Sequence, residues 1–347
     1  MRFPGDPPGT PPAHAAAMAS SIAHLRARDI ELIDVIGRGG MATVYRGRQR
    51  TLGRDVAVKI LDHTETLEAR SRFVREARLA AQIHHPNAID IYDFGVLEDG
   101  RMYLVMELLR GQDLSQLMRR PLSLERIVNV LQQVLAALDE AHAVGVLHRD
   151  VKPENIFVDS RGGAELVTLL DFGLARPLFG GSNITAVNMA CGTAEYMSPE
   201  QSCGEDVDCR TDVYAATVVL FELLTGEQPF AGATPAETLR LQVDAPIPDP
   251  AELAPWRKLA PVWTAIVRRG LAKERSDRFA SAIELSHALA DALGRRDSSV
   301  PPTRAIGQCP ACGETGMGRF CGHCGGLLVS RGEAVTEELV KQVERKG

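Results

Sequence analysis

The most informative motif of the sequence is His148-Arg149-Asp150-Val151-Lys152-Pro153-Glu154-Asn155, which is followed further along the chain by Asp171-Phe172-Gly173. Transfer of a phosphoryl group to a hydroxyl needs a carboxylate that accepts the hydroxyl proton, a lysine that neutralises the moving group, and oxygen ligands for Mg²⁺. Asp150, Lys152, Asn155 and Asp171 offer these groups in that order. The alternative is that the polar residues only cap a loop, but a loop cap does not need all four groups. The string therefore predicts phosphotransfer chemistry.

A second motif lies upstream, where a glycine-rich turn separates two apolar runs: Gly37-Arg38-Gly39-Gly40-Met41-Ala42-Thr43-Val44. Glycines let backbone amides approach a phosphate closely. On its own, this turn also fits a plain hairpin. The next apolar run carries Lys59, and the helix predicted after it carries Glu76. Snorkelling from an edge strand would explain Lys59 alone, but a lysine and a glutamate beside a glycine turn are the pair needed to clamp the α and β phosphates of ATP.

The apolar pattern changes character near Gly111. Before it, extended runs predict antiparallel strands near 30–36, 43–45, 56–60, 89–94 and 102–106, with a helix over 66–83 between the third and fourth. After it, helical spacing predicts helices over 124–143, 211–225, 261–271 and 279–293. A small β-rich part followed by a larger helical part is expected.

These motifs resemble those of the protein kinase family, and most closely the bacterial Hanks-type (eukaryotic-like) serine/threonine kinases. The closer match lies in the glycine turn, in the Arg-Phe-x-Arg-Glu-Ala segment that ends at Ala77, and in the Gly-Thr-Ala-Glu-Tyr-Met-Ser-Pro-Glu segment that ends at Glu200. It covers roughly residues 30–293. The resemblance implies an α+β, two-lobed kinase fold with a small antiparallel β-rich lobe and a larger helical lobe.

The resemblance also implies catalytic roles. Asp150 would be the catalytic base, Lys152 would contact the γ-phosphate, and Asn155 and Asp171 would bind Mg²⁺ or Mn²⁺. Lys59 would hold the α and β phosphates of ATP when paired with Glu76, so that both belong to the catalytic set.

Further positions follow from the same resemblance. Glu200 would pair with Arg278, and Asp212 would brace the catalytic loop from a buried helix. The nucleotide would be held by the glycine turn, by a hinge with Met106 as gatekeeper, by a residue near the ribose and by apolar residues on both faces of adenine: Ile36, Gly37, Gly39, Gly40, Val44, Ala57, Lys59, Met106, Glu107, Leu108, Asp113 and Phe157.

Two classes of function compete. Lys152, two residues after the expected base, and Thr193 favour serine and threonine acceptors over tyrosine within this family, so protein substrates are the expected partners. The alternative is a pseudokinase scaffold that binds partners through the kinase fold and the C-terminal module. A scaffold need not keep the catalytic set, whereas this chain has all of it, which favours the enzyme.

Four of the seven cysteines form two pairs, Cys309-Pro-Ala-Cys312 and Cys321-Gly-His-Cys324. Four thiolates at this spacing can close a tetrahedron around Zn²⁺. The pattern resembles a small zinc ribbon with no open coordination position, so a structural Zn²⁺ is expected. Disulfides fit a cytosolic chain poorly. The module could stabilise the tail only or could also dock a partner, and the sequence leaves both interpretations open.

Composition limits the remaining possibilities. The 347 residues are 45% hydrophobic and 24% charged, as in ordinary soluble proteins. The formal net charge of -6 argues against nucleic acid as a partner. The longest apolar stretch, from Val213 to Leu224, is too short for a membrane span, and the proline-rich start is unlike a signal peptide. A cytoplasmic location is therefore expected.

The composition shifts along the chain predict five parts. They are a disordered Pro- and Ala-rich lead-in at 1–27, a kinase domain at 28–293, a linker at 294–307, a zinc ribbon at 308–329 and a short charged helical tail at 330–347.

Regulation by phosphorylation is also expected. The segment after Asp171 is polar and contains Ser182 and Thr185. A phosphate adds about -1.5 to -2 charges and can pair with Arg149, which precedes the expected base. Thr185 lies seven residues before Gly192, where the resembling kinases often carry a phosphorylated threonine. Thr185 is therefore the expected main autophosphorylation site and Ser182 a minor one, while a plain polar loop residue is the alternative.

Overall fold

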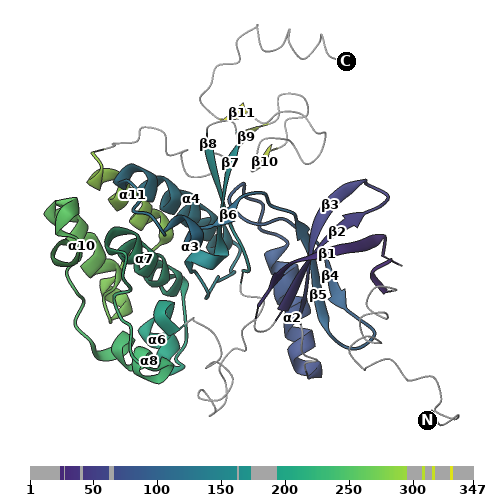
Figure 1. Ribbon diagram of the computed structural model, residues 1–347, viewed down its shortest axis with the longest axis horizontal. Helices are drawn as coiled ribbons and strands as arrows, with labels where there is room; N and C mark the ends of the chain where they lie inside the picture. Colours follow the sequence, from purple (N-terminus) through teal and green to yellow (C-terminus); the bar gives the residue numbers. More distant parts are fainter. Residues whose placement is uncertain are drawn as a thin grey trace, which may run out of the picture. The chain divides into compact units, whose positions relative to one another are not determined.

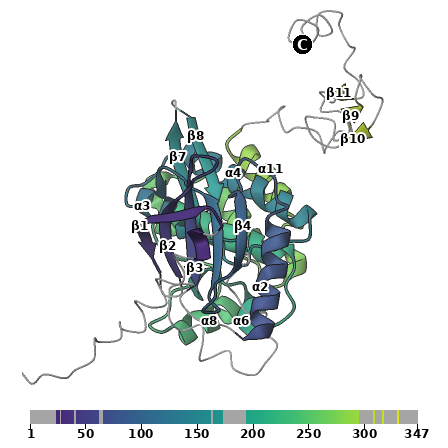
Figure 2. The same cartoon turned by 90° about the vertical axis from the view of Figure 1, so that its right-hand side faces the viewer.

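Five antiparallel strands form the N-terminal sheet of the computed structural model (Figure 1). They are β1 (Ile30–Arg38), β2 (Ala42–Gln49), β3 (Arg54–Leu61), β4 (Ile91–Val96) and β5 (Met102–Glu107), in the order β1-β2-β3-β5-β4. Along β3, Val56, Val58 and Ile60 are fully buried, and the alternation of a strand places Lys59 on the opposite face. Helix α2 (Leu67–Ala80) runs beside β4 (Figure 2). Its Phe73 is buried.

The structure describes residues 24–26, 28–39, 42–61, 66–161, 164–172 and 194–294, with the backbone of three short strands further on. The chain divides into two compact units, Met1–Arg295 and Arg296–Gly347. The five-stranded sheet and the helices of the described residues belong to the first unit.

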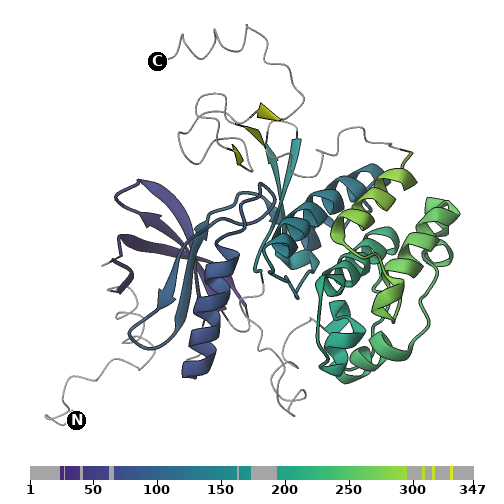
Figure 3. The ribbon, with the colours of Figure 1, turned by 180° about the vertical axis from the view of Figure 1, so that it is seen from behind.

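A helical lobe follows the five-stranded sheet within the first unit. Its centre is α7 (Cys209–Thr225), which is buried on almost every side and against which α4 (Leu124–Ala143), α10 (Pro261–Gly270) and α11 (Ala282–Ala292) pack (Figure 3). A helix that is apolar all round belongs in the core of a domain. The shorter helices are α3 (Leu114–Leu117), α6 (Pro199–Cys203), α8 (Pro235–Asp244) and α9 (Pro250–Leu253). No helix in the described part of the chain is long and apolar enough to cross a membrane.

A small second sheet lies at the point where the two lobes meet. It is antiparallel, has the order β6-β7-β8, and consists of β6 (Gln112–Asp113), β7 (Ile156–Arg161) and β8 (Ala164–Leu169). The motif His148 to Asn155 leads into β7 through the 3-10 turn η1 (Pro153–Asn155), and Asp171 follows β8. The hairpin therefore brings the two halves of the sequence motif together.

The second unit is described only through three short strands. They are β9 (Gly307–Gln308), β10 (Thr315–Gly316) and β11 (Val329–Ser330), which pair antiparallel in the order β10-β9-β11. Cys309, Cys312, Cys321 and Cys324 lie outside the described residues, as do Ser182 and Thr185.

Candidate active site

The loop before Asp150 is fixed by a carboxylate from the central helix. Asp212 lies in the first turn of α7 and is completely buried. Its carboxylate oxygens accept the backbone N–H groups of His148 at 2.8 Å and Arg149 at 2.7 Å, and His142 Nε2 lies 2.7 Å away. Burial alone would raise the pKa of Asp212, but the hydrogen bond and charge of His142 and the amide of His148 hold that pKa below its ordinary value. The predicted brace is confirmed.

Two non-glycine residues of the site have a left-handed backbone conformation. Arg149 has φ 64° and Asp171 has φ 58°. Such conformations cost free energy and persist only where surrounding contacts impose them, as at functional sites. The peptide of Arg149 is held on both sides, because its N–H donates to Asp212 and its carbonyl accepts Gln201 Nε2 at 3.1 Å.

His148 connects the loop to the segment that carries Asp171. Its Nδ1 accepts the backbone N–H of Asp150 at 3.2 Å, so Nε2 carries the proton and donates to the Leu170 carbonyl at 2.6 Å. The ring also packs edge-on against Phe172, with the centroids 4.9 Å apart. Burial lowers the pKa of His148 below its ordinary value although the charge of Asp212 opposes this, which matches the neutral tautomer that these contacts need.

Three of the predicted catalytic side chains converge. Lys152 Nζ lies 3.0 Å from Asp150 Oδ2. Asn155 Nδ2 donates to the Asp150 carbonyl at 2.8 Å and to its Oδ2 at 3.1 Å. The Lys152 ammonium and the Asn155 amide thus both contact the Asp150 carboxylate.

The fourth side chain, Asp171, forms an ion pair across the two lobes. Lys59 Nζ donates to Asp171 Oδ2 at 2.6 Å, although the residues are 112 positions apart in the chain. Burial would raise the pKa of Asp171, but the charge and hydrogen bond of Lys59 hold it below its ordinary value. Lys59 and Asp171 therefore face each other at the point where the β-rich and helical lobes meet.

The partner of Lys59 differs from the expected one. The sequence predicts a pair with Glu76, whereas the ion pair that Lys59 makes within the described part of the chain is with Asp171. The physical reason is that the half-buried Asp171 carboxylate needs a positive charge to offset its desolvation. Glu76 lies on α2 and makes contacts of its own.

The predicted nucleotide contacts lie on neighbouring strands. Gly37 of β1 pairs with Val44 of β2, and Val44 pairs with Lys59 of β3, so the glycine turn is next to the lysine. Ala57 pairs with Met106, and Glu107 ends β5 immediately before Leu108. The Ile36 side chain is 48% exposed at the end of the same sheet. Gly39 N donates to the Ala42 carbonyl across the turn, while Gly40 lies outside the described residues.

Asp113 and Phe157 occupy the second sheet and pair with each other across β6 and β7. Asp113 also caps α3, because its carboxylate accepts the Gln116 N–H at 3.1 Å and Gln116 Nε2 at 2.6 Å. The carboxylate of Asp113 thus has a structural role as the N-cap of α3.

The oxygen atoms of Asn155 and Asp171 are suitable ligands for a hard divalent cation. The Asn155 amide nitrogen is directed to Asp150, which leaves its amide oxygen as the group that can bind a metal, and the Leu170 N–H donates to the Asn155 carbonyl at 2.8 Å. That bond places Asp171, the next residue after Leu170, beside Asn155. A carboxylate and an amide oxygen are ligands that Mg²⁺ accepts.

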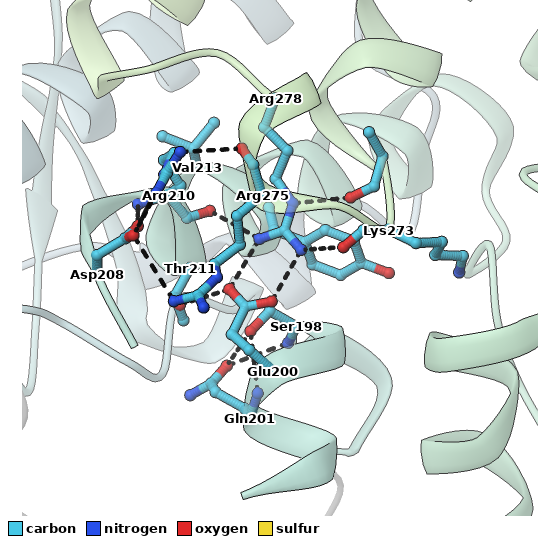
Figure 4. A network of polar contacts seen from close by, with 12 residues as sticks. Ser198, Glu200, Gln201, Asp208, Arg210, Thr211, Val213, Lys273, Arg275 and Arg278 are labelled. Carbon is cyan, nitrogen blue, oxygen red and sulfur yellow. Dashed lines mark hydrogen bonds and ion pairs between the residues drawn. The ribbon is translucent and has the colours of Figure 1, made fainter. Parts of the chain in front are cut away.

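A buried ion pair joins Glu200 of helix α6 to Arg278, which follows the turn η4 (Arg275–Asp277) (Figure 4). Arg278 donates from Nη1 and Nη2 to the two oxygens of Glu200, both at 2.8 Å, and the two side chains are 0% and 2% exposed. Thr211 Oγ1 also donates to Glu200 at 2.7 Å. Burial would raise the pKa of Glu200, but the hydrogen bonds and charge of Arg278 lower it. The predicted pair is confirmed.

Several contacts of the site carry no sequence signal that periodicity could detect. His142 reaches Asp212 from α4, Gln201 reaches the Arg149 carbonyl from α6, and Gln242 reaches the backbone of residues 194–195 from α8. Each is a single polar residue on a helix, and its partner lies between 47 and 70 positions away. Only the tertiary structure brings them to the site.

Comparison with known proteins agrees with this geometry. The family model described as "Protein kinase domain" matches residues 30–290. A serine/threonine-protein kinase of Myxococcus xanthus, pkn3, is 41% identical over 72% of this chain and 47% of its own length, and PknH of Mycobacterium bovis is 38% identical over 76% and 44%. This chain thus spans less than half the length of these curated relatives.

Solved structures give the same result. The crystal structure of the Mycobacterium tuberculosis PknI kinase domain superposes with a TM-score of 0.61 at 27% identity, and covers 76% of this chain and 96% of that chain. A point mutant of that domain gives a TM-score of 0.62 at 28% identity. The two-lobed α+β fold that the sequence predicts is confirmed, and the chain belongs to the protein kinase family, as a Hanks-type kinase.

Proposed function

We propose that the protein is a serine/threonine protein kinase that transfers the γ-phosphoryl group of ATP to protein hydroxyls. The observation that carries the proposal is the convergence of Lys152 and Asn155 on the Asp150 carboxylate. Family membership and the similarity to bacterial serine/threonine-protein kinases support it.

In this mechanism Asp150 accepts the proton of a serine or threonine hydroxyl. The hydroxyl oxygen forms a bond to the γ-phosphorus, the bond from that phosphorus to the β–γ bridging oxygen breaks, and ADP leaves. Lys152 lies beside Asp150 and balances the negative charge of the moving phosphoryl group. Asp212, His148 and Gln201 keep Asp150 in place by fixing the loop backbone.

Asn155 and Asp171 would hold Mg²⁺ or Mn²⁺, which supplies positive charge to the phosphate oxygens when bound. Lys59 would move from Asp171 to the α and β phosphates and use Glu76 as its counter-ion. The adenine would lie between Val44 and Ala57 on one side and Phe157 on the other, next to Met106, Glu107 and Leu108.

The test compares Asp150→Asn with the wild-type protein. The variant keeps the size of the side chain but cannot accept a proton, so transfer of labelled phosphate should fall by about 100-fold or more while ATP affinity stays nearly unchanged. Asp277→Asn is the matched control, because it makes the same change at an exposed carboxylate of the turn η4 (Arg275–Asp277). Undiminished transfer by Asp150→Asn would contradict the mechanism.

The measurement of phosphate transfer by the wild-type protein also distinguishes an active kinase from a pseudokinase scaffold. A scaffold would bind ATP weakly or not at all and would transfer no phosphate, even as the wild-type protein. The presence of the whole catalytic set in the sequence, and the contacts of Lys152 and Asn155 with Asp150 and of Lys59 with Asp171, favour the enzyme.

We also propose that residues 28–293 form the kinase domain, with the lead-in 1–27 before it, and that 308–329 form a zinc ribbon between the linker 294–307 and the tail 330–347. The match over 30–290 and the division after Arg295 support the main boundary. The spacing of Cys309, Cys312, Cys321 and Cys324 supports Zn²⁺ as a structural ligand. A cytoplasmic location and docking through the ribbon stay predictions.

A further proposal concerns regulation. Phosphorylation of Thr185, with Ser182 as a minor site, would provide an anion for Arg149, whose backbone is held in a left-handed conformation next to Asp150. Phosphopeptide mapping should find phosphate on Thr185 in the active wild-type protein and none on Thr185 in the Asp150→Asn variant. Normal activity of Thr185→Ala would contradict the regulatory role while leaving the kinase assignment intact.

A further inference from the structure

Gln242 of α8 is a polar side chain that is 0% exposed, in a position where a helix usually buries an apolar residue. Its amide nitrogen donates to two backbone carbonyls, those of Ala194 at 3.1 Å and Glu195 at 2.6 Å. Its amide oxygen accepts the hydroxyl of Tyr214 at 2.6 Å. A flipped amide would turn its oxygen toward two carbonyl oxygens, so these partners fix one orientation of the group.

The position of Gln242 is itself determined by its neighbours. Lys273 Nζ donates to the Gln242 backbone carbonyl at 2.7 Å and lies 3.7 Å from the centroid of the Phe230 ring. Tyr214 comes from the central helix α7, and the guanidinium of Arg278 lies 4.8 Å from the centroid of its ring. Lys273 and Tyr214 of α7 therefore both hold Gln242 in place. A residue that positions another group has to be fixed itself in this way.

The backbone that Gln242 holds borders the proposed catalytic loop. The turn η2 (Ala194–Tyr196) leads directly into α6, where Gln201 donates to the carbonyl of Arg149. Tyr196 donates its hydroxyl to Glu222 at 2.6 Å, and the charge of Glu154 from the catalytic motif acts on both side chains. Through α6 and Gln201, the η2 backbone is thus connected to the loop that carries Asp150.

We propose that Gln242 is a positioning residue for the acceptor polypeptide. This role rests on the proposed kinase function, and it concerns the binding of the acceptor polypeptide rather than the binding of ATP. By holding the Ala194 and Glu195 carbonyls, Gln242 keeps the η2 backbone in the single conformation to which the acceptor binds. Without that bond, the acceptor would have to order this backbone as it binds, and its affinity would fall.

The test uses the full chain with dephosphorylated casein as the acceptor. Gln242→Met keeps the length of the side chain and removes both donors and the acceptor. We expect the KM for casein to rise by about 10-fold, since two hydrogen bonds to the segment are lost, while the KM for ATP changes by less than about twofold. Tyr214→Phe keeps both N–H donors of the Gln242 amide and removes only the hydroxyl that fixes the orientation of that amide. A smaller rise in the casein KM is therefore expected. This variant serves as the test if Gln242→Met does not fold.

Thr238→Val is the matched control. Thr238 is a buried polar residue on the same helix, but its hydroxyl accepts the Gly232 N–H at 3.0 Å instead of contacting η2. This variant should keep the wild-type KM for casein even where its melting temperature is lowered. A similar rise in the casein KM for Thr238→Val, or equal changes in the KM for casein and for ATP in Gln242→Met, would show a merely structural role and overturn the proposal.

The two proposals fail in different ways. Wild-type protein that transfers no phosphate to any protein acceptor would contradict the proposed function. Active wild-type protein whose casein KM is unchanged in both Gln242→Met and Tyr214→Phe would contradict only the role of Gln242.

Discussion

At the scale of single residues, burial decides what a charged side chain contributes. The Glu200–Arg278 pair is almost fully enclosed, and its oxygens and nitrogens are satisfied by Thr211 and by backbone carbonyls as well as by each other. The attraction between the two charges offsets the cost of removing them from water, but only as long as both members are present. The stability of the helical lobe should therefore depend on keeping the pair complete.

Removing one member of this pair should be costly. Arg278→Met leaves a buried carboxylate without its cation, so we expect the free energy of unfolding to fall by about 3–5 kcal/mol, measured by urea denaturation. The matched control is Arg275→Met, since Arg275 lies 3.7 Å from Asp208 in a partly exposed pair, where the loss should be at most about 1 kcal/mol. Equal losses in the two variants would contradict the distinction.

Two histidines should make the stability depend on pH. Burial lowers the pKa of His148 and of His85 in the folded protein, whereas a histidine of the unfolded chain takes up a proton near pH 6.5. Below that pH the unfolded chain binds more protons, so the free energy of unfolding falls as the pH falls, by up to about 1.4 kcal/mol per pH unit for each histidine.

The expected window is from about pH 6.5 down to about pH 5, because carboxylates with lowered pKa values, such as Asp171 and Asp212, lose their contribution only below about pH 4. Urea denaturation at several pH values measures the slope. His85→Gln should remove its own share of the slope and leave the share of His148. Because burial raises the pKa of Glu222, that carboxyl acts in the opposite direction in this window. The decisive quantity is therefore the difference in slope between wild type and His85→Gln, and identical slopes would show that His85 does not resist protonation.

At the scale of elements, the contact between α7 and α10 depends on one glycine. A Cβ added at Gly270 would overlap Thr217 Oγ1 and would lie 2.6 Å from its Cγ2. Thr217 is fully buried, and its hydroxyl donates to the Val213 carbonyl one turn earlier. The two helices therefore approach closely at this point because one of them has no side chain there.

We expect Gly270→Ala to lower the free energy of unfolding by about 1–3 kcal/mol through overpacking. Thr217→Ala removes the hydroxyl and the methyl group, so the double variant should recover part of that loss, whereas independent sites would simply add their effects. Thermal or urea denaturation of the two single variants and the double variant measures the coupling. Strict additivity would contradict the close contact.

Helices with an apolar face were predictable from the sequence. The expected helix over 124–143 corresponds to α4 (Leu124–Ala143), and the helix expected from 279 begins at Ala282 because Ser281 caps it by accepting the Glu284 N–H. Helix α8 was not predicted. Its buried side includes the polar Thr238 and Gln242, so hydrophobic spacing did not reveal it, although Thr234 and Pro235 at its start fit a helix N-terminus.

The candidate site was predictable where its residues are adjacent in sequence. The motif from His148 to Asn155 identified the side chains that meet at Asp150. The choice of partner for Lys59 was not predictable in the same way, because Glu76 and Asp171 are both carboxylates and only tertiary geometry selects between them. The long-range supports, such as Gln201 and Gln242, depend on how helices pack and leave no local pattern.

At the scale of the whole molecule, the chain consists of a kinase unit and a separate C-terminal unit. The family match ends at residue 290, before the division after Arg295. The four paired cysteines all belong to the second unit. A zinc ribbon at 308–329 would have little apolar core of its own, so metal binding would supply most of its folding free energy. Phosphotransfer, by contrast, would depend on residues of the first unit alone.

The purified full chain should therefore contain about one Zn²⁺ per molecule when it is prepared without chelators. Changing Cys309, Cys312, Cys321 and Cys324 to Ser removes the thiolate ligands, so elemental analysis should find no Zn²⁺, while phosphate transfer to casein should stay within about twofold of wild type. Cys203→Ser/Cys209→Ser is the matched control, because it removes the two free thiols of the described kinase unit and should leave the Zn²⁺ content unchanged. Wild-type protein without Zn²⁺ would overturn the metal assignment, and loss of phosphate transfer in the four-serine variant would show that the two units depend on each other.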